Sequence, residues 1–438
     1  MDKLKSIWGE QKLLVILVLL PVIFMAGLIL LKAVNVPYYD QWEFEPIIHH
    51  VKDGHFYFYD LWHLHNEHRI FFPRIVMLTS AILTKWNLEA ENWIGFVIAC
   101  GSFVLILKTF KQTTEKLKDK IVFLAPVLLS VIWFSPVQFE NWLWGWQIQW
   151  FLSVLGIVMV ALGIVRIKGR ELSYPDLLLM LSGGVLASYS LGNGVIIWPI
   201  LILVLLYTRV SLLKTAIAAV TGAITTGLYY YHYVSPTPSS PSEILKEPVL
   251  FAKYVLAYLG RPLSFFHKLA PIMGLCLLII FFGLNLYLLI RKRKIFDAVL
   301  PLTAMGLYAI ASSMATAMSR MGLGLGQAYT SRYTTISSLL LVATVVICVE
   351  SRGIFKVWFK GLYRPIAFFV TIAVFGLVLL NVAWGIHGSN IRSRELTDSK
   401  ACTHTAQPSQ ACLLYAYPNA EVVQGRLDYL KQIHWGGY

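Results

Sequence analysis

Charged residues are scarce in this sequence. Only 14% of its 438 residues are Asp, Glu, Lys or Arg, whereas an ordinary soluble domain carries roughly 25%. Hydrophobic residues make up 57% of the chain, and the mean hydropathy is +0.65. The shortage of charge excludes a soluble globular enzyme, and the lack of a short repeat or a highly charged composition excludes a fibrous or disordered chain. We therefore expect an all-α polytopic membrane protein.

Apolar runs of about 20 residues mark the helices that can cross the hydrocarbon of a bilayer. No A-x-A-like cleavage site follows the first run, so we interpret it as a retained anchor. Residues 70–84 are apolar but form a short segment that contains Arg74, so they are either a twelfth span or a helix in the interface. The sequence predicts about eleven transmembrane helices, at residues 13–34, 92–109, 121–137, 148–166, 176–190, 194–208, 213–231, 271–290, 297–318, 335–350 and 366–385.

The distribution of positive charge decides between these two interpretations. The chain has 37 Lys and Arg against 23 Asp and Glu. If 70–84 lies in the interface, the connecting segments on the side of the N-terminus hold 21 Lys and Arg in 59 residues, and those on the other side hold 15 in 181. This asymmetry is typical of a cytoplasmic N-terminus. A spanning 70–84 would instead place the RKRK run at 291–294 outside. The net charge therefore indicates topology, and we expect no nucleic-acid partner.

Among the exterior segments that this topology gives, three are long: a large first loop at 35–91, a second loop at 232–270 and a C-terminal tail at 386–438, which is short for a separate domain. Residues 1–385 form the predicted transmembrane domain. The stretch 235–243, SPTPSSPSE, has the composition of a loop.

The cysteines divide by location. Cys100, Cys276 and Cys348 lie within predicted spans and are interpreted as small apolar packing residues. Cys402 and Cys412 lie ten positions apart in the exterior tail, where an oxidising compartment would permit a disulfide. Two free thiols are the alternative.

A carboxylate follows the first predicted span closely. Asp40 lies in the run VPYYDQWEFE. A carboxylate near the bilayer surface is partly desolvated and can accept a proton from a hydroxyl group, so Asp40 is a candidate general base. Glu43 is one helical turn further on and is the second candidate. A solvated loop acid is the alternative interpretation.

A histidine-rich stretch, WHLHNEHR, occupies residues 62–69. His63, His65 and His68 could ligate a metal ion, but no HExxH pattern or cysteine accompanies them, so we predict no metal and no other cofactor. We expect His65, Glu67 and His68 to contact a sugar or an acceptor and Arg69 to contact a phosphate. A solvated interfacial helix is the alternative.

Aromatic and amide side chains mix in QFENWLWGWQ at residues 138–147. Asn141, Trp142 and Gln147, with Asn193 of a later exterior turn, have the composition of a sugar-binding surface, because sugar rings present both apolar faces and hydroxyl groups. An aromatic belt at the membrane surface is the alternative.

Two arginines lie in the exterior segment 319–334. An arginine at the membrane surface stays charged and fits a phosphate with two hydrogen bonds, so Arg320 and Arg332, with the adjacent Tyr333, are candidates for holding a lipid phosphate. Snorkelling anchors are the alternative.

An acidic residue soon after the first span, a large first exterior loop with an interfacial helix and arginines on later exterior loops together resemble the C-type (GT-C fold) membrane glycosyltransferases. Within this family, the chain looks most like bacterial enzymes that modify O-antigen and other surface polysaccharides. The resemblance implies a multi-pass protein of the bacterial inner membrane that takes a sugar from a polyprenyl-phosphate carrier and inverts its anomeric configuration. It implies a polysaccharide or glycolipid acceptor and gives the role of base to Asp40. The chain lacks the WWD-type motif of oligosaccharyltransferases, so we do not expect sequon-directed protein glycosylation.

Two other classes compete with this interpretation. A transporter or flippase should place broken helices in two related halves around a site at the bilayer midplane, and we find no such halves. A polysaccharide polymerase or ligase usually has its large exterior loop late in the chain, whereas the large loop here comes first.

Overall fold

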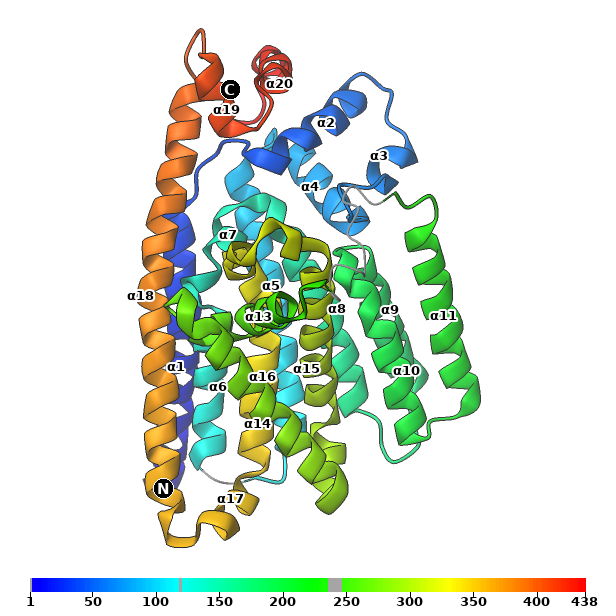
Figure 1. Cartoon of the computed structure of the whole chain (residues 1–438), viewed down its shortest axis with the longest axis vertical. Helices are drawn as coiled ribbons and strands as arrows, with labels where there is room; N and C mark the ends of the chain where they lie inside the picture. The colour runs from blue at the N-terminus through cyan, green and yellow to red at the C-terminus, as the bar shows by residue number, and fades with distance from the viewer. Residues whose placement is uncertain (1, 118–119, 235–245) are drawn as a thin grey trace.

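The computed structural model describes residues 2–117, 120–234 and 246–438, and in these ranges the protein is a bundle of helices (Figure 1). The only β-type pairings among the described residues are two isolated bridges, His65 with His68 and Lys168 with Glu171. The predicted all-α polytopic membrane fold is therefore confirmed. The stretch 235–243, predicted to be a loop, lies outside the described residues.

Nine helices among the described residues are long and apolar enough to cross a membrane. The other two predicted spans fall on α9 (Tyr174–Ser188) and α10 (Ile197–Thr208), which have 15 and 12 residues. At 1.5 Å per residue, both are shorter than the roughly 30 Å of hydrocarbon, so the count of eleven is not confirmed. The helices on which the nine long spans fall are α1 (Asp2–Lys32), α5 (Leu88–Thr113), α6 (Lys120–Trp133), α8 (Ile148–Val165), α11 (Leu212–Tyr230), α14 (Ala270–Arg291), α15 (Arg293–Arg320), α16 (Thr334–Glu350) and α18 (Tyr363–Thr403).

Helices α8 and α16 form the centre of the bundle, and 83% of the most apolar window of each is buried. Small residues allow close packing there. A Cβ atom added at Gly156 of α8 would lie 2.3 Å from the carbonyl oxygen of Gly183 in α9. Since neither position tolerates a side chain, α8 and α9 pack backbone against backbone.

The first exterior loop folds into short helices at the end of the bundle opposite the N-terminus (Figure 1). They are η1 (Tyr39–Phe44), α2 (Glu45–Lys52), α3 (Phe58–Trp62) and α4 (Phe71–Thr84). Helix α4 has 14 residues, which is too short to span, and Arg74 on it is buried with a hydrogen bond of 3.2 Å to the carbonyl of Leu61. Residues 70–84 thus form a helix, and their predicted place in the interface stays a prediction.

Helix α18 continues without a break past residue 385. It runs beside α1 and then projects well beyond the end of α1 (Figure 1). Helices α19 (Gln410–Ala416) and α20 (Ala420–Ile433) follow, and a disulfide joins Cys402 to Cys412. The tail packs against the first exterior loop through one shared apolar cluster, whose members include Trp42, Phe44, Ile47, Leu413, Leu427 and Trp435. The loop and the tail therefore share one core, at the end of the bundle opposite the N-terminus.

Shorter elements connect the long helices. They are η2 (Pro136–Gln138), α7 (Phe139–Leu143), η3 (Gly145–Gln147), η4 (Gly192–Ile196), α13 (Pro248–Gly260), η5 (Arg261–Leu263), η6 (His267–Leu269), η7 (Met321–Leu323), η8 (Leu325–Tyr329), η9 (Ser331–Tyr333), α17 (Arg352–Phe359) and η10 (Lys360–Leu362).

Candidate functional site

A polar cavity of about 280 Å³ lies beneath the first exterior loop. Its walls come from η1, the histidine-rich turn, the start of α8 and the loop between α15 and α16. Nine of the side chains predicted from the sequence line it: Asp40, His65, Glu67, His68, Gln147, Asn193, Arg320, Arg332 and Tyr333.

Asp40 is held in place by the helical turn that carries it. The neighbouring Gln41 is buried, and its Nε2 donates to Oε2 of Glu91 on α5 at 3.0 Å. The other oxygen of Glu91 accepts a hydrogen bond of 3.1 Å from Nε1 of Trp86. Because η1 is fixed on this side, the Asp40 side chain faces the cavity, and 35% of it is exposed.

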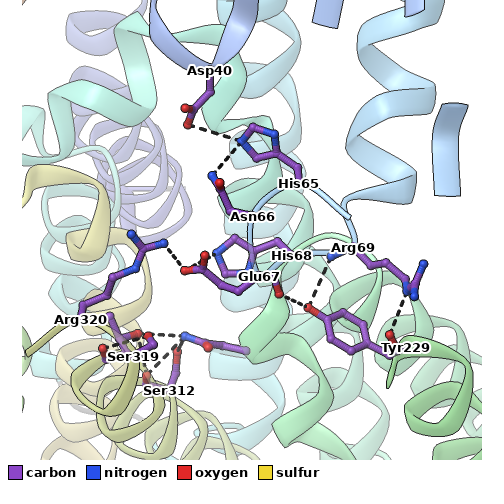
Figure 2. Close-up of polar contacts among 12 residues, drawn as sticks. Asp40, His65, Asn66, Glu67, His68, Arg69, Tyr229, Ser312, Ser319 and Arg320 are labelled. Atoms are coloured by element: carbon purple, nitrogen blue, oxygen red, sulfur yellow. Dashed lines mark hydrogen bonds and ion pairs between the residues drawn. The ribbon is translucent and has the colours of Figure 1, made fainter. Parts of the chain in front are cut away.

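Opposing influences act on the pKa of Asp40. Desolvation raises the pKa, but the neighbouring His65 and the positive charges of Arg332 and Arg320 lower it more, so the net pKa is below the ordinary 3.8. The nearest of these contacts joins Oδ2 of Asp40 to Nε2 of His65 at 3.8 Å (Figure 2). Asp40 is therefore a carboxylate at neutral pH.

A tight turn places three side chains of the histidine-rich stretch at the cavity. The backbone N–H groups of His65 and His68 each donate to the other residue's carbonyl, at 2.8 and 2.9 Å. Asn66 in between has φ +50°. Glu67 forms an ion pair with Arg320, and Nε2 of His68 lies 3.6 Å from the same carboxylate (Figure 2). Burial lowers the pKa of His68 to about 4, so its ring is neutral.

The three histidines considered as metal ligands do not converge. Nδ1 of His63 donates to the carbonyl of Tyr59 at 3.0 Å, and its Nε2 accepts a hydrogen bond of 3.0 Å from Arg74, away from the cavity. Nowhere in the described ranges do three or more His, Cys, Asp or Glu side chains form a group that could hold a metal ion.

Arg332 differs from Arg320 in its partners. The Arg320 guanidinium is paired with Glu67, whereas no carboxylate in the described part of the chain lies within ion-pair distance of the Arg332 guanidinium. That group lies 5.7 Å from the ring centre of Tyr333. Arg332 thus presents a positive charge to the cavity, on a residue whose backbone is firmly held.

Four predicted site residues do not line the cavity. Arg69 donates to the carbonyls of Trp62, Tyr229 and Tyr231 and so ties the loop to α11. Glu43 faces the C-terminal tail, where it accepts hydrogen bonds from Tyr417 and Arg426.

The other two members of this group are Asn141 and Trp142. Asn141 donates to the Arg332 carbonyl at 2.8 Å and to Thr335. Trp142 is fully buried, with its Nε1 bonded to the carbonyl of Ser135 at 3.0 Å. Both side chains therefore form hydrogen bonds within the protein that stabilise its fold.

Sequence reasoning missed part of the wall. The aromatic side is formed by three tryptophans, and the ring of Trp146 meets His65 edge to face at 4.7 Å between centres. Two of them stand in the run that the sequence analysis singled out, where alternating Trp residues were the available signal. The missed residues are Tyr39, Asn66, Trp144, Trp146, Gln149, Trp150, Leu191, Thr316 and Ser319.

Comparisons with known proteins give only distant likenesses. No protein-family model matches the chain, and no curated protein matches it. Among solved structures, it is similar to the archaeal oligosaccharyltransferase AglB from Archaeoglobus fulgidus in complex with an inhibitory peptide and a dolichol-phosphate, with 13% identity and a TM-score of 0.48 over 86% of this chain and 56% of that one. It is also similar to the apo form of the Archaeoglobus fulgidus oligosaccharyltransferase, with 13% identity and a TM-score of 0.43 over 94% and 61%.

The chain therefore spans 56 to 61% of the length of these two proteins. At this distance the likeness assigns neither a family nor an activity to this chain.

Proposed function

We propose that this protein is an inverting glycosyltransferase that moves one sugar from a polyprenyl-phosphate carrier to a hydroxyl group of a surface polysaccharide or lipid-linked glycan, on the outer face of a bacterial inner membrane. One observation carries the proposal. The ionised Asp40 and the Arg332 guanidinium, which has no carboxylate partner among the described residues, face the same cavity.

The proposed reaction is a direct displacement. The acceptor oxygen attacks the anomeric carbon while its proton passes to Asp40, a contribution that is typically 10²–10⁴-fold for a general base. The bond from the anomeric carbon to the carrier phosphate breaks, and the phosphate leaves with the bonding electrons. Arg332 stabilises the charge that develops on it. Because a phosphate leaves without needing a proton, the scheme includes no general acid, and no metal is proposed.

The shape and lining of the cavity support a sugar as its occupant. Trp144, Trp146 and Trp150 offer aromatic faces, and Gln147 and Asn193 offer polar groups. The volume of about 280 Å³ is slightly below the roughly 300–1,000 Å³ of small-molecule pockets. It favours a single sugar residue over a preassembled oligosaccharide.

Replacement of Asp40 tests the proposal. We expect Asp40→Asn to lower sugar transfer by about 10² or more, because it removes the proton acceptor at nearly constant volume. The measurement is the mass of surface polysaccharide repeat units from cells that express the wild type, Asp40→Asn or neither. A sugar-sized mass increase seen only with the wild type is the expected result.

The matched control is Asp53→Asn, which changes the same kind of residue in the same loop but outside the cavity. It should transfer sugar like the wild type. Full transfer by Asp40→Asn would show that the base is another group. Carrier movement across vesicles without any mass increase would favour the transporter or flippase alternative, and longer polysaccharide without a new branch would favour a polymerase or ligase.

A further inference from the structure

The backbone of Arg332 is gripped from both sides by two consecutive residues of α7. Oε2 of Glu140 accepts the Arg332 N–H at 3.0 Å, and Nδ2 of Asn141 donates to the Arg332 carbonyl at 2.8 Å. The peptide of Arg332 is thereby fixed while its side chain stays at the cavity. A buried carboxylate consequently lies beside the arginine that the proposed function assigns to the phosphate.

A second arginine occupies the other oxygen of that carboxylate. Nη2 of Arg392, on the projecting part of α18, donates to Oε1 of Glu140 at 3.0 Å, and both side chains are only 11% exposed. The Arg392 guanidinium is also held by Glu395 at 3.2 Å and lies over the rings of Tyr38 and Trp144, at 5.2 and 5.8 Å from their centres. Arg392 is therefore rigidly aimed at Glu140.

We infer that Arg392 is a positioning residue that keeps Arg332 available to an anionic ligand by satisfying Glu140. This inference rests on the proposed function, because it deepens the role of Arg332 in holding the carrier phosphate. A buried carboxylate that loses its partner keeps a strong need for a cation. Arg332 is already bonded to Glu140 through its own N–H, so its side chain is the cation that would turn to Glu140. The guanidinium would then leave the cavity.

The arrangement predicts that a second mutation rescues the first. Arg392→Met keeps an apolar stem over Tyr38 and Trp144 but removes the charge, and we expect it to weaken binding of polyprenyl monophosphate by about tenfold or more, as loss of a charge-assisted contact does. In the double variant Glu140→Gln, Arg392→Met the carboxylate at position 140 that would divert Arg332 is gone, so binding should return to within about threefold of the wild type. Glu140→Gln alone should also bind more tightly than Arg392→Met, because the carboxylate that would divert Arg332 is gone and an amide oxygen still accepts the Arg332 N–H.

The test is a binding titration of the purified full-length variants with polyprenyl monophosphate in detergent micelles, with the melting temperature of each variant recorded. Arg332→Ala defines the binding that remains without the guanidinium, and Arg392→Lys, which keeps a charge, should bind better than Arg392→Met.

A double variant as weak as Arg392→Met, or an Arg392→Met that binds like the wild type, would overturn the inference alone. If Arg392→Met does not fold, the double variant carries the test, and its failure to bind overturns the inference. No binding by the wild type would overturn the proposed function itself, and this inference with it.

Discussion

As the proposed base, Asp40 is unusual because its pKa is held low. His65 and the arginines that lower the pKa also keep the carboxylate ionised and aimed at the cavity. A carboxylate of low pKa accepts a proton weakly from a resting hydroxyl group. In the proposed displacement, the acceptor hydroxyl group becomes acidic only as its oxygen forms the bond to the anomeric carbon. The carboxylate therefore accepts the proton late in the reaction. A phosphate leaving group, which departs readily beside Arg332, suits such a base.

The low pKa of Asp40 sets the expected pH dependence. Because the pKa in the folded protein lies below 3.8, the carboxylate is present above that value and is lost only as the pH falls through it. We expect the transfer rate with saturating donor to show no loss of base between about pH 5 and pH 8. The measurement is the initial rate of sugar transfer in vesicles buffered across this range. An acidic limb with a midpoint near 6.5 would instead assign the base to an imidazole, with His65 next to Asp40 as the first to replace.

At the scale of elements, the first exterior loop depends on the tail for its position. Arg426 on α20 donates to the carbonyl of Trp42 at 2.6 Å, and its guanidinium lies 3.3 Å from Glu43 and 3.8 Å from Glu45. The stacking of His49 on Tyr429, at 3.9 Å between ring centres, extends this contact along α2. The tail thus holds the residues that directly follow Asp40.

Glu45 makes this contact sensitive to pH. It is only 3% exposed, and burial outweighs the attraction of Arg426 and raises its pKa from 4.5 to about 7. The folded protein therefore binds this proton more tightly than the unfolded chain does. Binding of this proton to Glu45 stabilises the folded protein fully below about pH 4.5, and the stabilisation is lost as the pH rises through 7. Its contribution to the free energy of unfolding is at most on the order of 3 kcal/mol.

We accordingly expect the wild-type protein to melt at a lower temperature at pH 8 than at pH 5, and Glu45→Gln to reduce this difference by stabilising the protein at pH 8. Thermal unfolding of the purified protein in detergent measures both. Glu421→Gln, which changes an exposed glutamate of the tail, should leave the difference unchanged. If Glu45→Gln melts lower than the wild type at pH 8, the carboxylate and Arg426 form a net stabilising ion pair there.

Charge and hydropathy predict which side of the membrane each candidate residue occupies, but not which way its side chain points. Asp40 and Arg332 both line the cavity, from segments almost 300 positions apart. Glu43 carries the same acidic group as Asp40, and Arg69 the same basic group as Arg332. Both lie in the first exterior loop, yet Glu43 points to Arg426 and Arg69 to the end of α11. Distant backbone carbonyls and side chains decide these directions, and no local pattern encodes them.

The aromatic run at 138–147 shows a second reason. Helix α7 has only five residues and gives way to the 3₁₀ turn η3. No single periodicity extends through so short a run. Trp142 therefore points into the bundle while Trp144 and Trp146 line the cavity. Long apolar runs, by contrast, fold as the sequence predicts, and α9 and α10 depart only in length.

At the scale of the whole molecule, the two ends of the bundle differ in charge, and this sets the expected orientation. The basic run at 291–294 covers the junction of α14 and α15, at the end of the bundle where the chain begins. We expect it to be cytoplasmic and the tail to be exterior. Alkaline phosphatase, which is active only outside the cytoplasm, should be active when fused after residue 438 and inactive when fused after residue 292. The reverse pattern would place the cavity on the cytoplasmic face and remove the outer-face reaction.

The contact between Arg426 and Trp42 joins residues 384 positions apart, and this has a consequence for biosynthesis. The ribosome delivers the loop that bears Asp40 early, when little beyond the first helix is in the membrane. The segment that holds this loop, α20, emerges only after α18 has been made. A nascent chain therefore carries Asp40 on a loop that lacks its contact with Arg426 until α20 has been made.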